Sequence, residues 1–155
     1  MKTTTKLLGL LVIALLTSCQ QESSEESKTF DKRMKETIRI HDDVMPQMSK
    51  INSLITELEA QKNELQQAEE VDTEKVELHN DAIANLKDAH DLMMSWMKNF
   101  SDSFSRTEIN SGLETTDKDS INAKLKLLDT QYASAEAMQK SITDAIENAQ
   151  VILSE

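Results

Sequence analysis

Apolar residues recur along most of this chain at alternating steps of three and four residues, with polar residues between them. The clearest stripe consists of Val76, His79, Ile83, Leu86, His90, Met93, Met97, Phe100 and Phe104. A second consists of Met34, Ile38, His41, Met45, Met48, Ile51, Ile55, Leu58 and Leu65. A third consists of Ile121, Leu125, Leu128, Tyr132, Ala135, Ile142, Ile146, Ala149 and Leu153. Because this spacing places each stripe on one face of a helix that packs against its neighbours, the pattern predicts three long α-helices.

Glycine and proline are scarce, which strengthens this prediction. The chain contains only Gly9, Gly112 and Pro46. Hairpins and phosphate-binding loops use glycine where the backbone takes a positive φ, so this chain has almost no means of building them. Pro46 lies inside the first helix, where it removes a backbone hydrogen bond and displaces the carbonyl of Asp42. The predicted fold is therefore all-α, an antiparallel bundle of three long helices whose first helix is kinked, or divided, near Pro46.

Capping residues and connections predict where the helices begin and end. The expected N-caps are Asp31 for the first helix, Asp72 or Thr73 for the second, and Asp117 or Asp119 for the third. A short connection at residues 69–72 forces the first two helices to lie antiparallel. The stretch 105–118, rich in Ser, Thr and Asn, is expected to be the loop before the third helix.

The first nineteen residues resemble a bacterial lipoprotein signal. A basic start with Lys2 and Lys6 precedes the apolar run Leu7–Leu16, and the segment ends Leu16-Thr17-Ser18-Cys19. A membrane-spanning helix needs about 20 apolar residues, so this run is too short to be an anchor. In a lipobox the cysteine is acylated and becomes the first residue of the mature chain, so Cys19 is the expected lipidation site. An ordinary cleaved signal peptide is the alternative.

The expected organisation follows from this signal. Residues 1–18 form the signal peptide, 19–30 the lipidated cysteine with an acidic flexible tether, and 31–155 the helical bundle. Lipid on Cys19 places the protein in the cell envelope, expected at the outer membrane and facing either the periplasm or the exterior. The acidic residues behind Cys19 also resemble the surface-export signals of Bacteroidetes-type lipoproteins.

The charge balance bears on possible partners. Removal of residues 1–18 takes away two lysines and changes the formal net charge from −11 to about −13. So negative a surface repels nucleic acid, because a protein binds its phosphates through clustered Lys and Arg side chains. Cys19 is the only cysteine, so no disulfide within the chain and no cysteine zinc cluster is possible. The expected partners are the membrane and an unidentified envelope protein, but not nucleic acid.

Two segments share the pattern His-Asp-x-x-Met-x-x-Met, beginning at His41 and at His90. In an antiparallel hairpin centred near residue 70, residues 41–48 lie level with about 92–99. The segments would then join Met45, Met48, Met93, Met94 and Met97 in one sulfur-rich layer beside His41 and Trp96.

Two interpretations of this layer remain open. Thioether and imidazole are ligands that suit Cu(I) or Ag(I), which predicts a soft-metal site formed by His41, Met45, Met48, Met94 and Met97. Methionine also fills irregular gaps in helical cores, especially near a proline kink, so the layer is alternatively packing alone.

The same residues carry a family resemblance. His41-Asp42-x-Val44-Met45-Pro46-x-Met48, then Met93-Met94-x-Trp96-Met97 and Ser141-Ile142-x-x-Ala145-Ile146, resemble a family of small Bacteroidetes lipoproteins. Some of its members carry the name "viral A-type inclusion protein". The resemblance covers most of residues 35–152 and implies a lipid-anchored helical protein, but the family has no established activity.

No catalytic motif is recognisable in the sequence. A glycine-rich phosphate loop, a His-Glu-x-x-His helix and a calcium loop with its glycine are all missing, and lipid would consume Cys19. We therefore expect a non-enzymatic envelope lipoprotein without a cofactor, which acts as a binding or structural module at a membrane surface. Soft-metal binding is the alternative.

Overall fold

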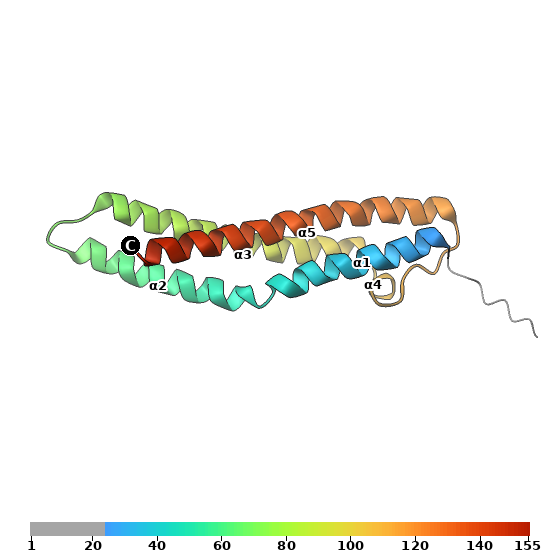
Figure 1. The fold of residues 1–155 in the computed structure, drawn as a ribbon, viewed down its shortest axis with the longest axis horizontal. Helices are drawn as coiled ribbons and strands as arrows, with labels where there is room; N and C mark the ends of the chain where they lie inside the picture. Colours follow the sequence, from blue (N-terminus) through green and yellow to red (C-terminus); the bar gives the residue numbers. More distant parts are fainter. Residues whose placement is uncertain (1–23) are drawn as a thin grey trace, which may run out of the picture.

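The computed structural model describes residues 24–155, and every regular element in this range is helical. The helices are α1 (Glu25–Val44), α2 (Gln47–Gln67), α3 (Thr73–Ser103), α4 (Arg106–Ser111) and α5 (Lys118–Leu153) (Figure 1). The predicted all-α fold is confirmed. Predictions that fall on residues 1–23, including Cys19, lie outside the described residues.

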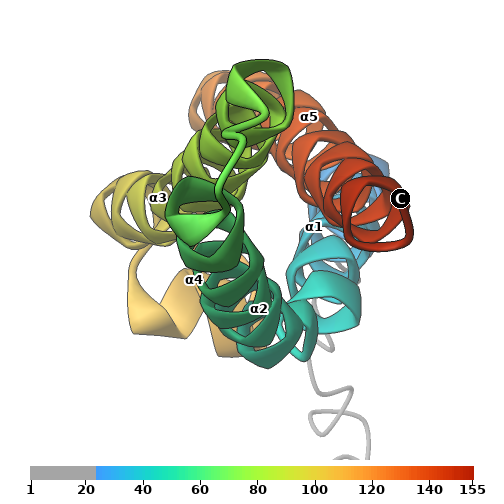
Figure 2. The ribbon, with the colours of Figure 1, turned by 90° about the vertical axis from the view of Figure 1, so that its left-hand side faces the viewer.

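The long helices form an elongated rod. α1 and α2 run end to end, α3 returns beside them in the opposite direction, and α5 runs parallel to α1 and α2 (Figures 1 and 2). α5 packs against α1, α2 and α3, and α2 packs against α3. The backbones of α1 and α3 approach each other little, so aromatic side chains span the space between these two helices.

The first helix begins earlier than the sequence analysis predicted. Its N-cap is Ser24, whose hydroxyl accepts a hydrogen bond from the Ser27 amide at 3.2 Å. Asp31 is therefore not the cap, and residues 25–30 belong to the helix rather than to a flexible tether. The physical reason is Phe30, which is fully buried and packs edge-on against Phe104 with ring centroids 6.0 Å apart. A contact so distant in sequence cannot be recognised in an acidic, polar stretch.

The helix break near Pro46 lies where it was expected. α1 ends at Val44 and α2 begins at Gln47. The Met45 amide still donates to the His41 carbonyl at 2.9 Å, and the Met48 amide donates to the Met45 carbonyl at 3.2 Å. Pro46 has no N–H to continue this series, so the helix divides at this residue.

Two other predicted caps are confirmed. The Asp72 side chain accepts from the Lys75 amide at 3.0 Å, and the Asp117 side chain accepts from the Ser120 amide at 2.9 Å. The predicted loop before α5 contains the short helix α4, which begins with a capping box at Ser105. It ends at Gly112, whose φ of +83° favours glycine and which lies against the Asp31 carboxylate.

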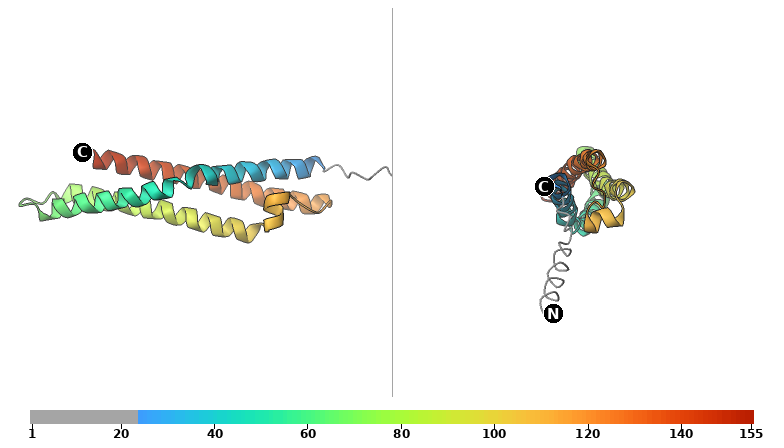
Figure 3. Two further views of the ribbon diagram at one scale, coloured as in Figure 1. Left: turned by 90° about the horizontal axis from the view of Figure 1, so that it is seen from below. Right: turned by 90° about the vertical axis from the view of Figure 1, so that its right-hand side faces the viewer.

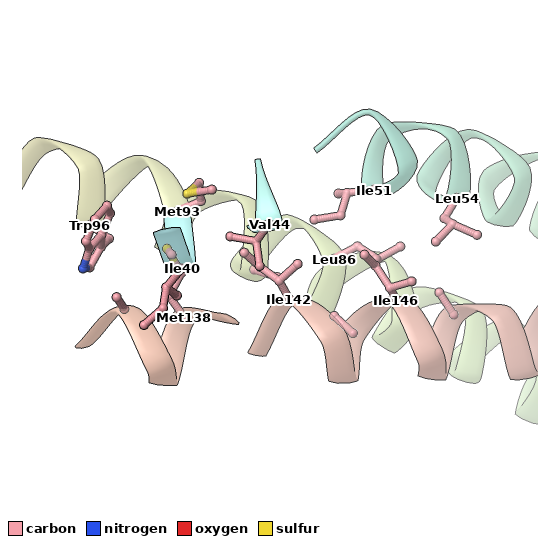
Figure 4. Close-up of a cluster of buried hydrophobic side chains, with 14 of the residues drawn as sticks. Ile40, Val44, Ile51, Leu54, Leu86, Met93, Trp96, Met138, Ile142 and Ile146 are labelled. Atoms are coloured by element: carbon pink, nitrogen blue, oxygen red, sulfur yellow. The ribbon is translucent and has the colours of Figure 1, made fainter. Parts of the chain in front are cut away.

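One hydrophobic core runs through the middle of the rod. The buried side chains drawn in Figure 4 include Ile40, Val44, Ile51, Leu54, Leu86, Met93, Trp96, Met138, Ile142 and Ile146. The stripe predicted on α3 is close to the observed one, but that on α1 is wrong near its end. Ile40 and Val44 are buried, whereas His41 is half-buried and Met45 is exposed. Neighbouring faces of α1 are both apolar, and Phe30 and Met34 fix which of them enters the core.

Candidate functional site

The five methionines of the repeated motif lie in different environments. Met93 is fully buried, Met48 and Met97 are half-buried, and Met45 and Met94 are each 46 % exposed. Met93 lies in the core with Ile40 and Met138 (Figure 4). The five side chains therefore do not form one buried sulfur layer. Soft-metal binding by part of the set stays a prediction.

The two motifs do meet at the same level of the rod. The His41 ring from α1 stacks on the Trp96 ring from α3, with centroids 5.8 Å apart and planes 22° from parallel. This contact confirms that residues near 41 lie opposite residues near 96, as the hairpin geometry predicted. His90, the histidine of the second motif, lies near its own neighbour, with His90 Nδ1 3.4 Å from Asp91 Oδ1.

His41 has an unpaired ring nitrogen. Its side chain is 22 % exposed, and Nδ1 lies 3.0 Å from Asp42 Oδ1. If that carboxylate accepts a hydrogen bond from Nδ1–H, the neutral ring carries its lone pair on Nε2. Nε2 is buried and has no hydrogen-bond partner within residues 24–155. The lone pair of such a nitrogen can bind a metal ion or accept a hydrogen bond.

An apolar depression of about 310 Å³ opens beside His41, between α1, α3 and α4. Its lining residues are Ile38, His41, Asp42, Trp96, Met97, Phe100 and Ile109. Of the methionines predicted to bind metal, only Met97 is among these lining residues. The depression therefore brings together His41 and Met97, but not Met45, Met48 or Met94.

A ladder of aromatic rings closes this side of the rod. Trp96 stacks on Phe100 with centroids 4.9 Å apart, and Phe100 contacts Phe104 at 5.2 Å. Trp96 Nε1 also donates to the Gln131 carbonyl of α5 at 3.1 Å. This ladder was not predicted from the sequence. The steps of four residues from Trp96 to Phe104 were the signal that could have revealed it.

His79 lies near the other end of the rod, where three helices meet. It is buried, with Nδ1 2.8 Å from the Lys75 carbonyl and Nε2 3.1 Å from Gln61 Oε1 of α2. The amide nitrogen of Gln61 in turn donates to the Leu153 carbonyl of α5 at 3.4 Å. His79 thus ties α3 to α2 and, through Gln61, to the last turn of α5.

A depression of about 390 Å³ lies directly beyond this junction. Its lining includes Leu65 of α2, Ala68 directly after that helix, Leu78 of α3 and Leu153 of α5. No motif marks it in the sequence, because it exists only where α5 ends before the hairpin of α2 and α3 does.

Ion pairs concentrate at the opposite end, where α1 and α5 begin. Lys118 Nζ lies 3.0 Å from Glu26 Oε1, and the pKa of Glu26 is lowered to about 2 by hydrogen bonds from its own backbone amide and from Lys118. Lys124 Nζ lies 2.8 Å from Glu108 Oε1. Burial raises the pKa of Glu108, but hydrogen bonds from Lys124 and Ser105 outweigh it, and the pKa is lowered overall.

Within residues 24–155 no three His, Cys, Asp or Glu side chains form a group that could hold a metal ion. None of the helices in this range has an apolar stretch of the length that crossing a membrane requires.

Comparison with known proteins adds no relative. No family model matches the chain, and neither the curated proteins nor the solved structures contain a significant match to it. The resemblance to small Bacteroidetes lipoproteins therefore stays a prediction.

Proposed function

We propose that this protein is a non-enzymatic envelope lipoprotein, held by acyl chains on Cys19, that acts as a binding or structural module at a membrane surface. The observation that carries the proposal is the sequence Leu16-Thr17-Ser18-Cys19 behind a basic start and an apolar run. Acyl chains on one cysteine supply stable anchoring when more than one is attached.

The shape of the molecule supports this role. Cys19 precedes the start of α1 at Glu25 by six residues. Six residues span at most about 21 Å, so the near end of the rod would lie close to the surface. α1 and α2 continue to Gln67, and at 1.5 Å per residue they extend about 65 Å. The turn between α2 and α3 would therefore stand far from the anchor, where it is accessible to partners.

The rod itself is proposed to be a three-helix bundle in solution, with α1 and α2 forming one kinked helix beside α3 and α5. Its support is the contact of α5 with all three neighbours. Circular dichroism of the protein should give a helix content well above half, and small-angle scattering should give an elongated particle. Substantial strand content would contradict the proposal.

Anchoring can be tested with Cys19→Ala. This variant should be unprocessed or should leave the membrane fraction, because no thiol remains to accept lipid. Ser23→Ala is the matched control, since it changes a nearby small residue and leaves the lipobox intact. Fractionation and metabolic labelling with a fatty acid measure the result. Unchanged processing and membrane association in Cys19→Ala would contradict the anchor.

Soft-metal binding is the second candidate function. It is favoured by the unpaired Nε2 of His41 and by the depression that His41 and Met97 both line. The predicted ligands are His41, Met45, Met48, Met94 and Met97. Tight binding of Cu(I) or Ag(I) would stabilise the fold by about 2.7 kcal/mol at a hundredfold excess over the dissociation constant.

The methionine substitutions distinguish binding from packing. Met45→Leu with Met48→Leu should abolish a metal-induced rise in Tm if these residues are ligands. Met34→Leu, a buried methionine outside the motif, is the control. If the methionines only pack, each leucine should cost less than about 1.5 kcal/mol and no metal effect should exist to be lost.

A further inference from the structure

The hairpin formed by α2 and α3 extends further than α5. α5 ends at Leu153, whose carbonyl accepts the hydrogen bond from Gln61. α2 continues from Gln61 to Gln67, and α3 begins at Thr73. About two turns of each helix, roughly 9 Å, therefore lie beyond the end of α5. Figures 1 and 3 show this part of the hairpin projecting past the C-terminus. In this region α2 and α3 pack together, and α5 does not extend beside them.

The space beyond the end of α5 has an apolar floor, which we call the tip groove. Leu65, Ala68 and Leu78 line it, with Leu153 at the end nearest α5. Leu78 is 41 % exposed, and nearby Val71 in the turn is 45 % exposed. In the rest of the bundle α5 covers the corresponding face of the hairpin. The groove therefore has the form and the chemistry of a seat for two turns of an amphipathic helix.

The surroundings of the tip groove are strongly acidic. Between residues 61 and 79 the acidic residues are Glu64, Glu69, Glu70, Asp72, Glu74 and Glu77, and the basic ones are Lys62 and Lys75. Glu64, Glu155 and Lys75 line the groove itself. The negative end of the α5 helix dipole also points toward this region. These charges attract a cationic partner and oppose a second copy of the same surface.

We propose that the tip groove binds a basic amphipathic helix of a partner protein, which takes the third position beyond α5. Apolar residues of this helix contact Leu65 and Leu78, and its lysines or arginines face the acidic rim. The inference rests on the proposed function, because it specifies the partner class of that binding module.

Binding can be measured with the full chain carrying Cys19→Ala, so that no lipid is attached. The probe is a fluorescent 14-residue peptide with leucine at positions i, i+3, i+4 and i+7 and lysine or alanine elsewhere. A peptide of the same composition in scrambled order is the control, since it has equal charge without an apolar face. We expect the patterned peptide to bind about tenfold more tightly than the scrambled one and to weaken as salt is added.

Paired variants locate the site. Leu78→Ser should weaken binding about fivefold or more, whereas Leu92→Ser should not change it. Leu92 is the matched control because it is also in α3, is 39 % exposed and lies outside the groove lining. Glu64→Lys should also weaken binding, while Glu57→Lys, an exposed position on the same helix, should not.

Three results would overturn the proposal: equal binding of the scrambled peptide, no effect of Leu78→Ser, or self-association of the chain that Leu78→Ser abolishes. The last would assign the groove to a second copy. The anchor proposal and the groove proposal can be contradicted independently, because peptide binding is measured without lipid and fractionation is measured without peptide.

Discussion

The two ends of this rod are built differently. All five aromatic residues, Phe30, Trp96, Phe100, Phe104 and Tyr132, lie in the half where α1 and α5 begin. Three ion pairs between separate elements join the same half, namely Glu26–Lys118, Arg33–Asp129 and Glu108–Lys124. The half containing the hairpin turn has aliphatic packing and one ion pair between elements, Glu59–Lys87. In this half α2 and α3 extend further than α5.

The difference shows how one small bundle can have a closely packed half and, at its other end, an accessible groove. Large rings bridge α1 and α3 where their backbones are far apart, so the half in which α1 and α5 begin is closed by side chains. At the other end small and aliphatic side chains let α2 and α3 pack directly, and the face that α5 leaves is open to a partner. Substitutions in the two halves should therefore have unequal consequences.

Trp96→Ala should produce the largest loss of stability. It removes a buried ring stacked on both His41 and Phe100, together with the hydrogen bond to the Gln131 carbonyl. The free energy of unfolding should fall by about 3–5 kcal/mol, measured by urea denaturation followed by circular dichroism. Leu78→Ala at the tip is the control and should cost about 1 kcal/mol or less. Equal losses at the two positions would remove the contrast between the halves.

Gln61→Ala should have an intermediate effect confined to the tip half. It leaves His79 Nε2 buried without its partner and releases the last turn of α5 from α2. The expected cost is about 1–3 kcal/mol, with faster amide hydrogen exchange in residues near Leu153 than near Lys118. Gln66→Ala, at an exposed position one turn further along α2, should change neither quantity. Uniformly faster exchange along α5 would show that the two ends are not independent.

The smallest effect should be the pH dependence of the end where α1 and α5 begin. The pKa of Glu26 in the folded protein is lowered from 4.5 to about 2. The ionised Glu26 therefore contributes fully to the stability of the fold above pH 4.5. This contribution is lost as the pH falls from 4.5 towards 2, since protonation breaks the pairing with Lys118. Glu26→Gln should therefore flatten the dependence of Tm on pH in this window. Glu147→Gln, at an exposed site on α5, is the control and should leave the slope unchanged.

Local chemistry in the sequence was enough to predict several parts of the fold. The caps at Asp72 and Asp117 depend on one carboxylate and an amide three residues away, and the break at Pro46 depends on one missing N–H. Scarce glycine and the spacing of apolar residues established the helical class. The level at which His41 meets Trp96 followed from a short hairpin connection and helix periodicity alone.

Other features were decided only by tertiary packing. Nothing in residues 25–30 by themselves shows that Phe30 packs on Phe104, more than seventy residues away, and so holds the first turns of α1 in the bundle. Ile40 and Val44 enter the core instead of His41 and Met45 because neighbouring faces of α1 are similarly apolar, and contacts with other helices choose between them. The tip groove depends on where α5 ends relative to α2 and α3. The relative positions of these helix ends cannot be predicted from any single segment, because they depend on how the three helices pack against one another.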